Sequence, residues 1–143
     1  MTVEAILRSK GNAVFTIRPE NSAGEAAALM SSRRVGVAVV CDVRGQVIGV
    51  VSERDIVAGI SQFGKGIVDI PVRNLMSSPV VTCAPSDPAK KVLEVMSERR
   101  IRHLPVVERG ELIGLVSIGD AVSYRLRQTQ LEAAVLRDFA AVR

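Results

Sequence analysis

The chain has 143 residues and a formal charge of +4, so it is long enough for one compact unit and too short for a regulatory module joined to a catalytic domain. No run approaches about eighteen consecutive apolar residues and the first residues contain no cleavage site, which argues against a membrane span and a signal peptide and makes the cytoplasm the expected compartment. The basic residues are spread over both halves without interleaved aromatics, so nucleic acid is not an expected partner.

The first elements predicted are a short strand and a helix. An apolar strand at 14–17 precedes Ser22, and Glu25 three residues later completes a capping box that begins a helix. Apolar residues then recur at helical spacing, which gives this helix one buried face. The two elements together predict a β-α unit.

A hairpin and a second helix follow. Strands at 35–41 and 46–51 flank a turn centred on Arg44-Gly45, in which the glycine can adopt a positive φ. Ser52 opens the next helix, and Asp55 lies in its first turn. The whole unit is therefore β-α-β-β-α, and its first strand can complete a three-stranded sheet with the hairpin.

The second half of the chain repeats this order. With residues 14–42 shifted by 66 positions and residues 45–57 by 65, 16 of 42 aligned residues are identical. The matching elements are a strand at 80–83, a helix with Asp87 as N-cap and Pro88 as its first residue, hairpin strands at 103–107 and 111–116 around Arg109-Gly110, and a helix opened by Ser117 with Asp120 in its first turn. Chance does not produce this agreement, so the chain contains two copies of one supersecondary unit.

The repeats define the expected organisation of the chain. The first repeat covers 1–60, a linker with two glycines and a proline covers 61–71, and the second repeat covers 72–123. Neither copy can cover both faces of its own sheet, so we expect the two to pack together with pseudo-two-fold symmetry. Residues 124–143 predict an amphipathic helix that contacts either a second subunit or its own, with its apolar side chains at Leu131, Val135, Phe139 and Val142.

The repeated segments resemble the cystathionine β-synthase (CBS) domain, which occurs in pairs called Bateman modules. The matching text is Gly49-Val50-Val51-Ser52-Glu53-Arg54-Asp55-Ile56, Gly114-Leu115-Val116-Ser117-Ile118-Gly119-Asp120-Ala121, Ile101-Arg102-His103-Leu104-Pro105-Val106-Val107 and the Met-Ser-x-Arg-Arg helix ends. The resemblance spans roughly residues 3–122 and implies a stand-alone CBS-domain pair of the α/β class, with two small three-stranded sheets. It also implies a flat homodimer and the binding of AMP, ATP, NAD(H) or S-adenosyl compounds in clefts between the repeats.

The two Ser-x-x-Asp segments support a nucleotide site on chemical grounds. Each places a hydroxyl and a carboxylate at a helix N-terminus, where free N–H groups and the helix dipole attract phosphate. The carboxylate can accept hydrogen bonds from both ribose hydroxyls. The plainer alternative is a capping pair with no ligand, and the two roles are compatible.

The resemblance implies further ligand contacts. Arg102 and His103 match positions that contact phosphate in the family, whereas the first repeat has Gly36 and Val37 there, so the two clefts are chemically unequal. Arg54 can compensate, and adenine would rest among Ile, Val and Pro side chains. The expected ligand-binding residues are Thr16, Ser52, Arg54, Asp55, Lys65, Thr82, Arg102, His103, Leu104, Pro105, Ser117 and Asp120.

An adenine-nucleotide sensor that changes conformation or partner binding is therefore the expected function, with an unidentified effector protein downstream. The alternative is a ligand-free interaction scaffold that uses the pair as a dimerisation platform. An enzyme is not expected, because His103 is the only histidine and no nucleophile elbow or phosphate loop is present. Cys41 and Cys83 form no CxxC pair and are predicted to be small apolar residues in strands, so neither a metal site nor a disulfide is expected. No catalytic cofactor is expected either.

Overall fold

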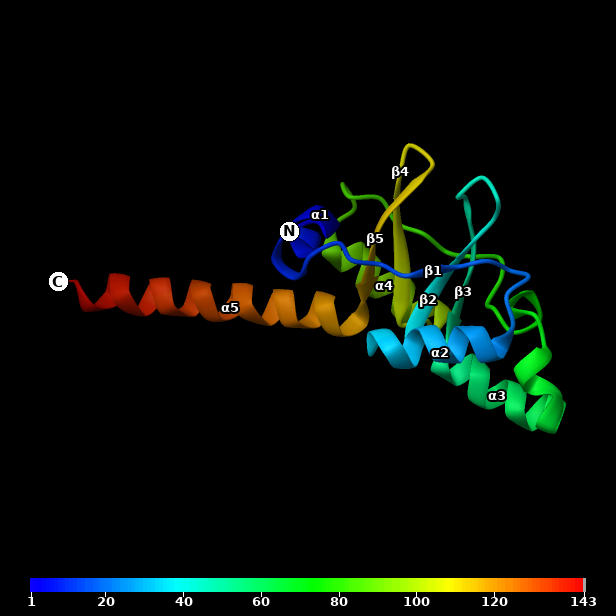
Figure 1. The fold of residues 1–143 in the computed structure, drawn as a ribbon. Helices are drawn as coiled ribbons and strands as arrows, with labels where there is room; N and C mark the ends of the chain where they lie inside the picture. The colour runs from blue at the N-terminus through cyan, green and yellow to red at the C-terminus, as the bar shows by residue number, and fades with distance from the viewer. Residues whose placement is uncertain (143) are drawn as a thin grey trace.

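The computed structural model describes residues 1–142, which fold around two small sheets (Figure 1). The last residue of the expected C-terminal helix, Arg143, lies outside the described residues. In chain order the elements are α1 (Val3–Lys10), β1 (Thr16–Ile17), α2 (Ala23–Arg33), β2 (Val37–Cys41), β3 (Val47–Ser52), α3 (Glu53–Phe63), the 3-10 helices η1 (Gly64–Asp69) and η2 (Val72–Asn74), α4 (Ala89–Arg99), β4 (His103–Glu108), β5 (Glu111–Ser117) and α5 (Ile118–Ala141).

The first repeat forms the expected three-stranded sheet. Strand β2 lies in the centre, parallel to β1 and antiparallel to β3. Val37 pairs with Ser52, so the hairpin delivers the end of β3 directly into the first turn of α3. The turn glycine, Gly45, has a φ of 79° as predicted. The α/β fold with paired repeats is thus confirmed.

The second sheet differs from the expectation, because only β4 and β5 are regular strands in it. The third strand predicted at 80–83 is reduced to one parallel bridge between Cys83 and Val106. Cys83 N donates to Pro105 O at 2.9 Å, and Val107 N donates to Cys83 O at 2.8 Å. Pro79 and Pro85 bound this segment, and a proline has no N–H with which to extend a ladder.

The predicted N-cap serines are found at three helix starts, and the fourth predicted cap is not. At Ser22 the predicted capping box is incomplete, because Glu25 Oε1 accepts a hydrogen bond from Ser22 Oγ and not from the Ser22 N–H. Ser22, Ser52 and Ser117 are N-caps, and the last two form reciprocal capping boxes with Asp55 and Asp120. The predicted N-cap Asp87 is wrong, because Pro88 occupies that position without a side-chain cap. The Asp87 carboxylate instead accepts a hydrogen bond from Ala84 N at 2.9 Å and lies 3.5 Å from Lys91 Nζ.

Helix α1 was not predicted, because it lies outside the repeated pattern. Thr2 caps its first turn and Gly11 follows its last residue with a φ of 97°, which are ordinary start and stop signals. Its Val3, Ile6 and Leu7 are buried in the core of the second repeat. The first repeat has a separate core, which contains Val40 and Val51 and extends to Val72 beyond α3. The two cysteines are free and buried, as predicted for small apolar residues.

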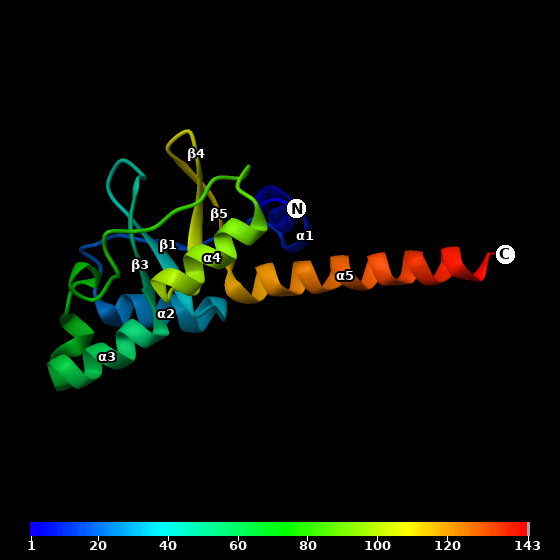
Figure 2. The ribbon, with the colours of Figure 1, turned by 180° about the vertical axis from the view of Figure 1, so that it is seen from behind.

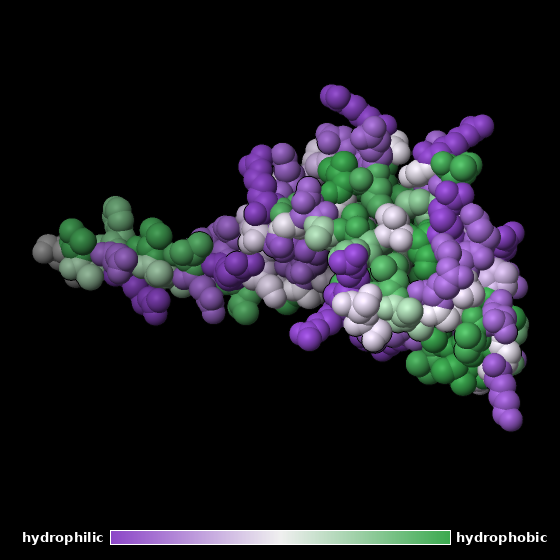
Figure 3. All heavy atoms as spheres, in the orientation of Figure 1, coloured by the Kyte–Doolittle hydropathy of each residue, from purple (hydrophilic) through white to green (hydrophobic). Residues whose placement is uncertain are grey.

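Helix α5 continues without a break from the second repeat into the expected C-terminal helix. Its first part packs against α4 and α1, while its far end projects from the body in both ribbon views (Figures 1 and 2). Apolar side chains gather at that end (Figure 3), where Leu136 is 70% and Phe139 80% exposed. This segment therefore does not dock on its own subunit. Within residues 1–142, none of the helices combines the length and apolar character needed to span a bilayer.

Candidate functional site

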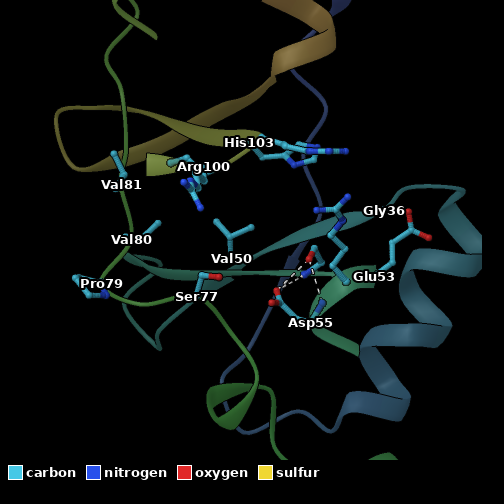
Figure 4. A pocket seen from close by; sticks show the side chains of 14 residues that line it. Gly36, Val50, Glu53, Asp55, Ser77, Pro79, Val80, Val81, Arg100 and His103 are labelled. Carbon is cyan, nitrogen blue, oxygen red and sulfur yellow. Dashed lines mark hydrogen bonds between the residues drawn. The ribbon is translucent and has the colours of Figure 1, made fainter. Parts of the chain in front are cut away.

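A cavity of about 340 Å³ lies between the two repeats. Its volume is in the range of small-molecule sites. The first repeat contributes the end of β3 and the start of α3, and the second contributes the approach to Cys83 and the residues that lead into β4 (Figure 4). The lining residues are Gly36, Val50, Ser52, Glu53, Arg54, Asp55, Ser77, Pro79, Val80, Val81, Arg100, Ile101, Arg102 and His103.

One wall of the cavity is the N-terminus of α3. Asp55 Oδ2 accepts hydrogen bonds from Ser52 N at 2.8 Å and Ser52 Oγ at 3.1 Å, while Ser52 Oγ accepts one from Asp55 N at 3.3 Å. These bonds use one carboxylate oxygen of Asp55 and leave Oδ1 available to a ligand hydroxyl. The capping role and a ligand role are therefore compatible at this helix start. A Cβ at Gly36 would collide with the Glu53 carboxylate, so glycine at this position lets Glu53 reach the cavity.

The opposite wall is basic. Figure 4 places Arg100 and His103 across the cavity from Asp55, and Arg102 also lines the cavity. Arg54 adds a third guanidinium from the first turn of α3. Within residues 1–142, no ion pair joins any of these three arginines to a carboxylate. Guanidinium groups without internal partners can bind phosphate oxygens in pairs of hydrogen bonds.

His103 adds a titratable group to this wall. Burial lowers its pKa below the ordinary value, and the charges of Lys10 and Arg102 lower it further against the opposing charge of Asp120. The imidazole is therefore mainly neutral at neutral pH. An anion bound between His103 and the arginines would favour the protonated form.

The remaining surface of the cavity is apolar. Val50 lies at the centre of the cavity in Figure 4, and Pro79, Val80 and Val81 form one side. Ile101, between Arg100 and Arg102 in the chain, also lines the cavity. Aliphatic side chains of this kind can pack against the face of a purine, whereas the polar walls suit a sugar and phosphate. Ser77 N donates to Val50 O at 2.9 Å, which fixes the second repeat's entry segment against β3.

The structure brings five of the expected site residues together: Ser52, Arg54, Asp55, Arg102 and His103 line the cavity. The other seven do not line it. Thr16, Lys65 and Thr82 are exposed elsewhere, although Thr82 directly follows the lining residue Val81. Leu104 and Pro105 are buried, and Leu104 belongs to the hydrophobic core of the second repeat. Ser117 and Asp120 form the capping box of α5 and do not line this cavity, although Ser117 pairs with the lining residue His103.

Asp120 has a partner that Asp55 lacks. Lys10 Nζ donates to Asp120 Oδ2 at 2.6 Å and to Leu115 O at 2.7 Å. Burial raises the pKa of the Asp120 carboxyl, but the hydrogen bonds from Lys10 and Ser117 and the lysine charge outweigh it, so the pKa is lowered. The two Ser-x-x-Asp segments therefore have different surroundings, and Lys10 at the end of α1 makes the difference.

Sequence reasoning missed the arginine and serine that complete the cavity. Arg100 entered the sequence analysis only as part of the repeated Met-Ser-x-Arg-Arg helix end, although its position two residues before Arg102 was a usable signal. Ser77 and Pro79 lie before the predicted first strand of the second repeat and carry no pattern of their own.

A second cavity of about 340 Å³, beside α1 and the β4-β5 hairpin, contains none of the expected residues. Among residues 1–142, no three His, Cys, Asp or Glu side chains cluster as metal ligands.

Comparison with known proteins identifies related sequences and folds. The CBS domain family matches residues 3–62 and 72–127. A CBS-domain containing protein from Agrobacterium tumefaciens is 37% identical, with a TM-score of 0.82 over 87% of this chain and 92% of that one. A CBS domain protein from Pyrobaculum aerophilum, solved in complex with AMP, is 31% identical, with a TM-score of 0.74 over 84% of this chain and 89% of that one.

Curated relatives extend beyond the matched region. A 33.4 kDa protein of the ribosomal RNA operon of Thermofilum pendens is 41% identical over 103 residues, which is 72% of this chain and 33% of that protein. The matches to the next two, from Methanopyrus kandleri and Acidianus ambivalens, cover 55% and 64% of those proteins. The chain therefore spans between a third and two thirds of the length of these relatives.

Proposed function

The chain belongs to the CBS domain family as a tandem pair, and on that basis we propose that it is a regulatory module that binds an adenine nucleotide without converting it. The observation that carries this proposal is the cavity between the repeats, where the capped start of α3, which carries Arg54, faces Arg100 and Arg102. None of the three arginines has an ion-pair partner among residues 1–142. A relative that is 31% identical and is complexed with AMP supports the same class of ligand.

The chemistry of the cavity suggests how the nucleotide would lie. The ribose hydroxyls would donate hydrogen bonds to the Asp55 carboxylate. The phosphate would lie between the start of α3 and the side chains of Arg100 and Arg102. The base would rest on Val50, Val80 and Val81. Three arginines exceed what one phosphate group requires, so the site also suits a di- or triphosphate such as ATP, or the pyrophosphate of NAD(H).

Ligand binding would act on both repeats at once. The cavity is lined from β3 and α3 on one side and from the segments before β4 on the other, so a bound nucleotide bridges the two repeats. Only one relative orientation of the repeats lets all of these groups contact the ligand. Occupancy would therefore shift the population toward that orientation, and an effector protein would read the change.

The exposed apolar end of α5 supports a second role as a dimerisation platform. Leu131, Val135, Leu136 and Phe139 are each at least 61% exposed, which is unusual for a cluster of large apolar residues. We propose that a second copy of the chain covers them. This role needs no ligand and is compatible with nucleotide binding.

The ligand role can be tested by calorimetry and thermal denaturation with AMP, ATP and NADH. A ligand present at a hundredfold excess over its Kd adds about 2.7 kcal/mol to the free energy of unfolding, so the Tm should rise by several degrees. Chromatography of each nucleotide after incubation should show no conversion. No Tm shift with any of the three would contradict the proposal and leave the dimerisation role.

Matched variants locate the site. Asp55→Asn removes the charged acceptor while nearly preserving shape, and Arg102→Met removes one phosphate donor, so each should weaken affinity about tenfold or more. Asp69→Asn and Arg44→Met make the same chemical changes at exposed residues outside the cavity and should leave affinity unchanged. Equal affinity in all four variants would rule out this cavity as the binding site.

A further inference from the structure

The internal repeat allows the counterpart of the cavity in the second half to be located. The shift of 65 positions carries Ser52 and Asp55 onto Ser117 and Asp120 at the start of α5. The shift of 66 carries Ser77 onto Gly11, which immediately follows Lys10. If the two halves behaved alike, a second nucleotide would therefore bind beside Asp120, next to the end of α1.

Lys10 takes over a contact that the backbone makes in the first repeat. There, Ser77 N donates to the carbonyl of Val50. The equivalent carbonyl, Leu115 O, instead accepts a hydrogen bond from Lys10 Nζ at 2.7 Å. The same ammonium lies 2.6 Å from Asp120 Oδ2, and the two side chains are only 29% and 26% exposed. Lys10 thus neutralises the carboxylate that would receive the ribose.

The rest of the counterpart position also lacks the features of the first cavity. Arg54 corresponds to Gly119, and Arg102 and His103 correspond to Gly36 and Val37, so three of the groups that suit phosphate are missing. Val81 corresponds to Phe15, a larger side chain whose ring lies 5.4 Å from the guanidinium carbon of Arg33. Fewer of the phosphate-binding side chains are therefore present at the counterpart position, and a larger apolar side chain takes the place of Val81.

We propose that Lys10 is a built-in counter-ion that closes the second cleft, so that each chain binds one nucleotide, at the Ser52–Asp55 cavity. This inference rests on the proposed function, because it assigns which of the two pseudo-equivalent positions binds the ligand. Lys10 is an autoinhibitory contact at Asp120, and α1 is the element that holds it in place.

The stoichiometry of AMP binding tests the inference. By isothermal titration calorimetry, the unmodified chain should bind one AMP per chain and Asp55→Asn should lose at least about tenfold in affinity. In the Asp55→Asn background, Lys10→Met frees the Asp120 carboxylate for ribose hydroxyls, so it should restore saturable binding of adenosine, which needs no phosphate-binding group, at least about tenfold above that background. Lys90→Met, at an exposed lysine of α4, is the matched control and should restore nothing.

The outcomes separate the inference from the proposed function. Two AMP molecules bound by the unmodified chain, or no recovery in the Lys10→Met, Asp55→Asn double variant, would overturn the closure by Lys10 while nucleotide binding stands. No binding of AMP, ATP or NADH by the unmodified chain would instead overturn the proposed function. Lys10→Arg keeps the charge at the end of α1, so it should keep one AMP per chain.

A second readout needs no ligand. His103 is the only histidine, so its proton resonances can be followed through a pH titration without assignment of the other residues. The positive charge of Lys10 lowers the pKa of His103 and the negative charge of Asp120 raises it. Lys10→Met should therefore raise the pKa of His103, and Lys90→Met should not. An unchanged pKa in Lys10→Met would show that Lys10 does not contact Asp120 in solution, which overturns the inference.

Discussion

At the scale of single residues, the cavity contains an arginine in a backbone conformation that favours glycine. Arg100 is the C-cap of α4 with φ 55° and ψ 42°, and its equivalent Arg34 ends α2 with φ 55° and ψ 43°. A left-handed conformation costs a non-glycine residue about 1 kcal/mol or more. The side chain of Arg100 lines the cavity and that of Arg34 does not, so only the former has a ligand-binding reason for this cost.

Arg100→Gly should therefore separate stability from binding. Relief of the left-handed conformation should raise the free energy of unfolding by roughly 0.5–1 kcal/mol, while loss of the guanidinium weakens AMP binding about tenfold. Arg34→Gly is the matched control, since it should give the same stabilisation with unchanged affinity. Urea unfolding and calorimetry on the two variants check both quantities. Equal affinity in the two variants would exclude Arg100 as a phosphate contact.

The titration of His103 predicts a pH dependence of stability. Its folded pKa is lowered below the 6.5 expected for the unfolded chain, so between these two values the unfolded state binds more protons. Stability should be highest above pH 6.5 and should fall as the pH drops through this window. His103→Gln should flatten that fall, measured as the free energy of unfolding at pH 8, 6.5 and 5.5. Parallel profiles for the two proteins would assign the pH dependence to other groups.

At the scale of elements, two segments of different structure cover equivalent glycines in the two repeats. Gly49 in β3 is covered by Met76 and Ser77, and its equivalent Gly114 in β5 is covered by Leu7 of α1. A Cβ at Gly49 would lie 2.7 Å from Met76 Sδ, and one at Gly114 would lie 2.9 Å from Leu7 Cδ2. Each glycine thus permits close approach of the segment that precedes the first strand of a repeat.

The features that could be predicted from the sequence are those that occur in both repeats. Both hairpins, the serine caps and the Ser52–Asp55 part of the cavity follow from motifs that occur twice, because each copy supports the other. Helix α1, and with it Lys10, could not be found this way, because it has no counterpart of the same type in the second copy. The cap at Asp87 failed because a local motif does not reveal that Ala84 and Lys91 compete for the carboxylate.

Gly49→Ala tests the close approach at the cavity. The new methyl group would also meet the backbone oxygen of Ser77 at 3.0 Å, which cannot move without disturbing its bond to Val50. We expect a loss of about 1–3 kcal/mol in the free energy of unfolding. Gly66→Ala, with nothing within 4 Å of the added Cβ, should be neutral or slightly stabilising. Urea unfolding that shows equal stabilities would mean that the segment at 76–77 is loosely held.

At the scale of the whole molecule, the two repeats have separate hydrophobic cores, and the cavity lined by Ser52 and Asp55 lies between the repeats. The N-terminal helix joins the core of the second repeat, whereas Val72 and Met76, which follow the linker, pack with the first. Each core therefore contains residues that precede or follow the other repeat in the chain, which holds the two repeats together. A ligand in the cavity would add contacts between the same two repeats. Such an arrangement suits a module whose two halves respond to occupancy as a pair.

The exposed apolar end of α5 leads to a prediction about dimerisation of the chain. Isolated helices are marginal in water, so a solvated apolar segment of α5 is best explained by a partner surface. If that partner is a second copy, Leu136→Glu with Phe139→Glu should convert a dimer to a monomer, because these side chains are 70% and 80% exposed in the single chain. Because these two exposed side chains do not belong to either hydrophobic core, the double change should leave the circular dichroism spectrum unchanged. Size-exclusion chromatography with light scattering measures the mass, and Arg137→Gln between the two positions should leave the dimer unchanged. The same mass for the double variant and the unmodified chain would show that the end of α5 does not hold two copies together.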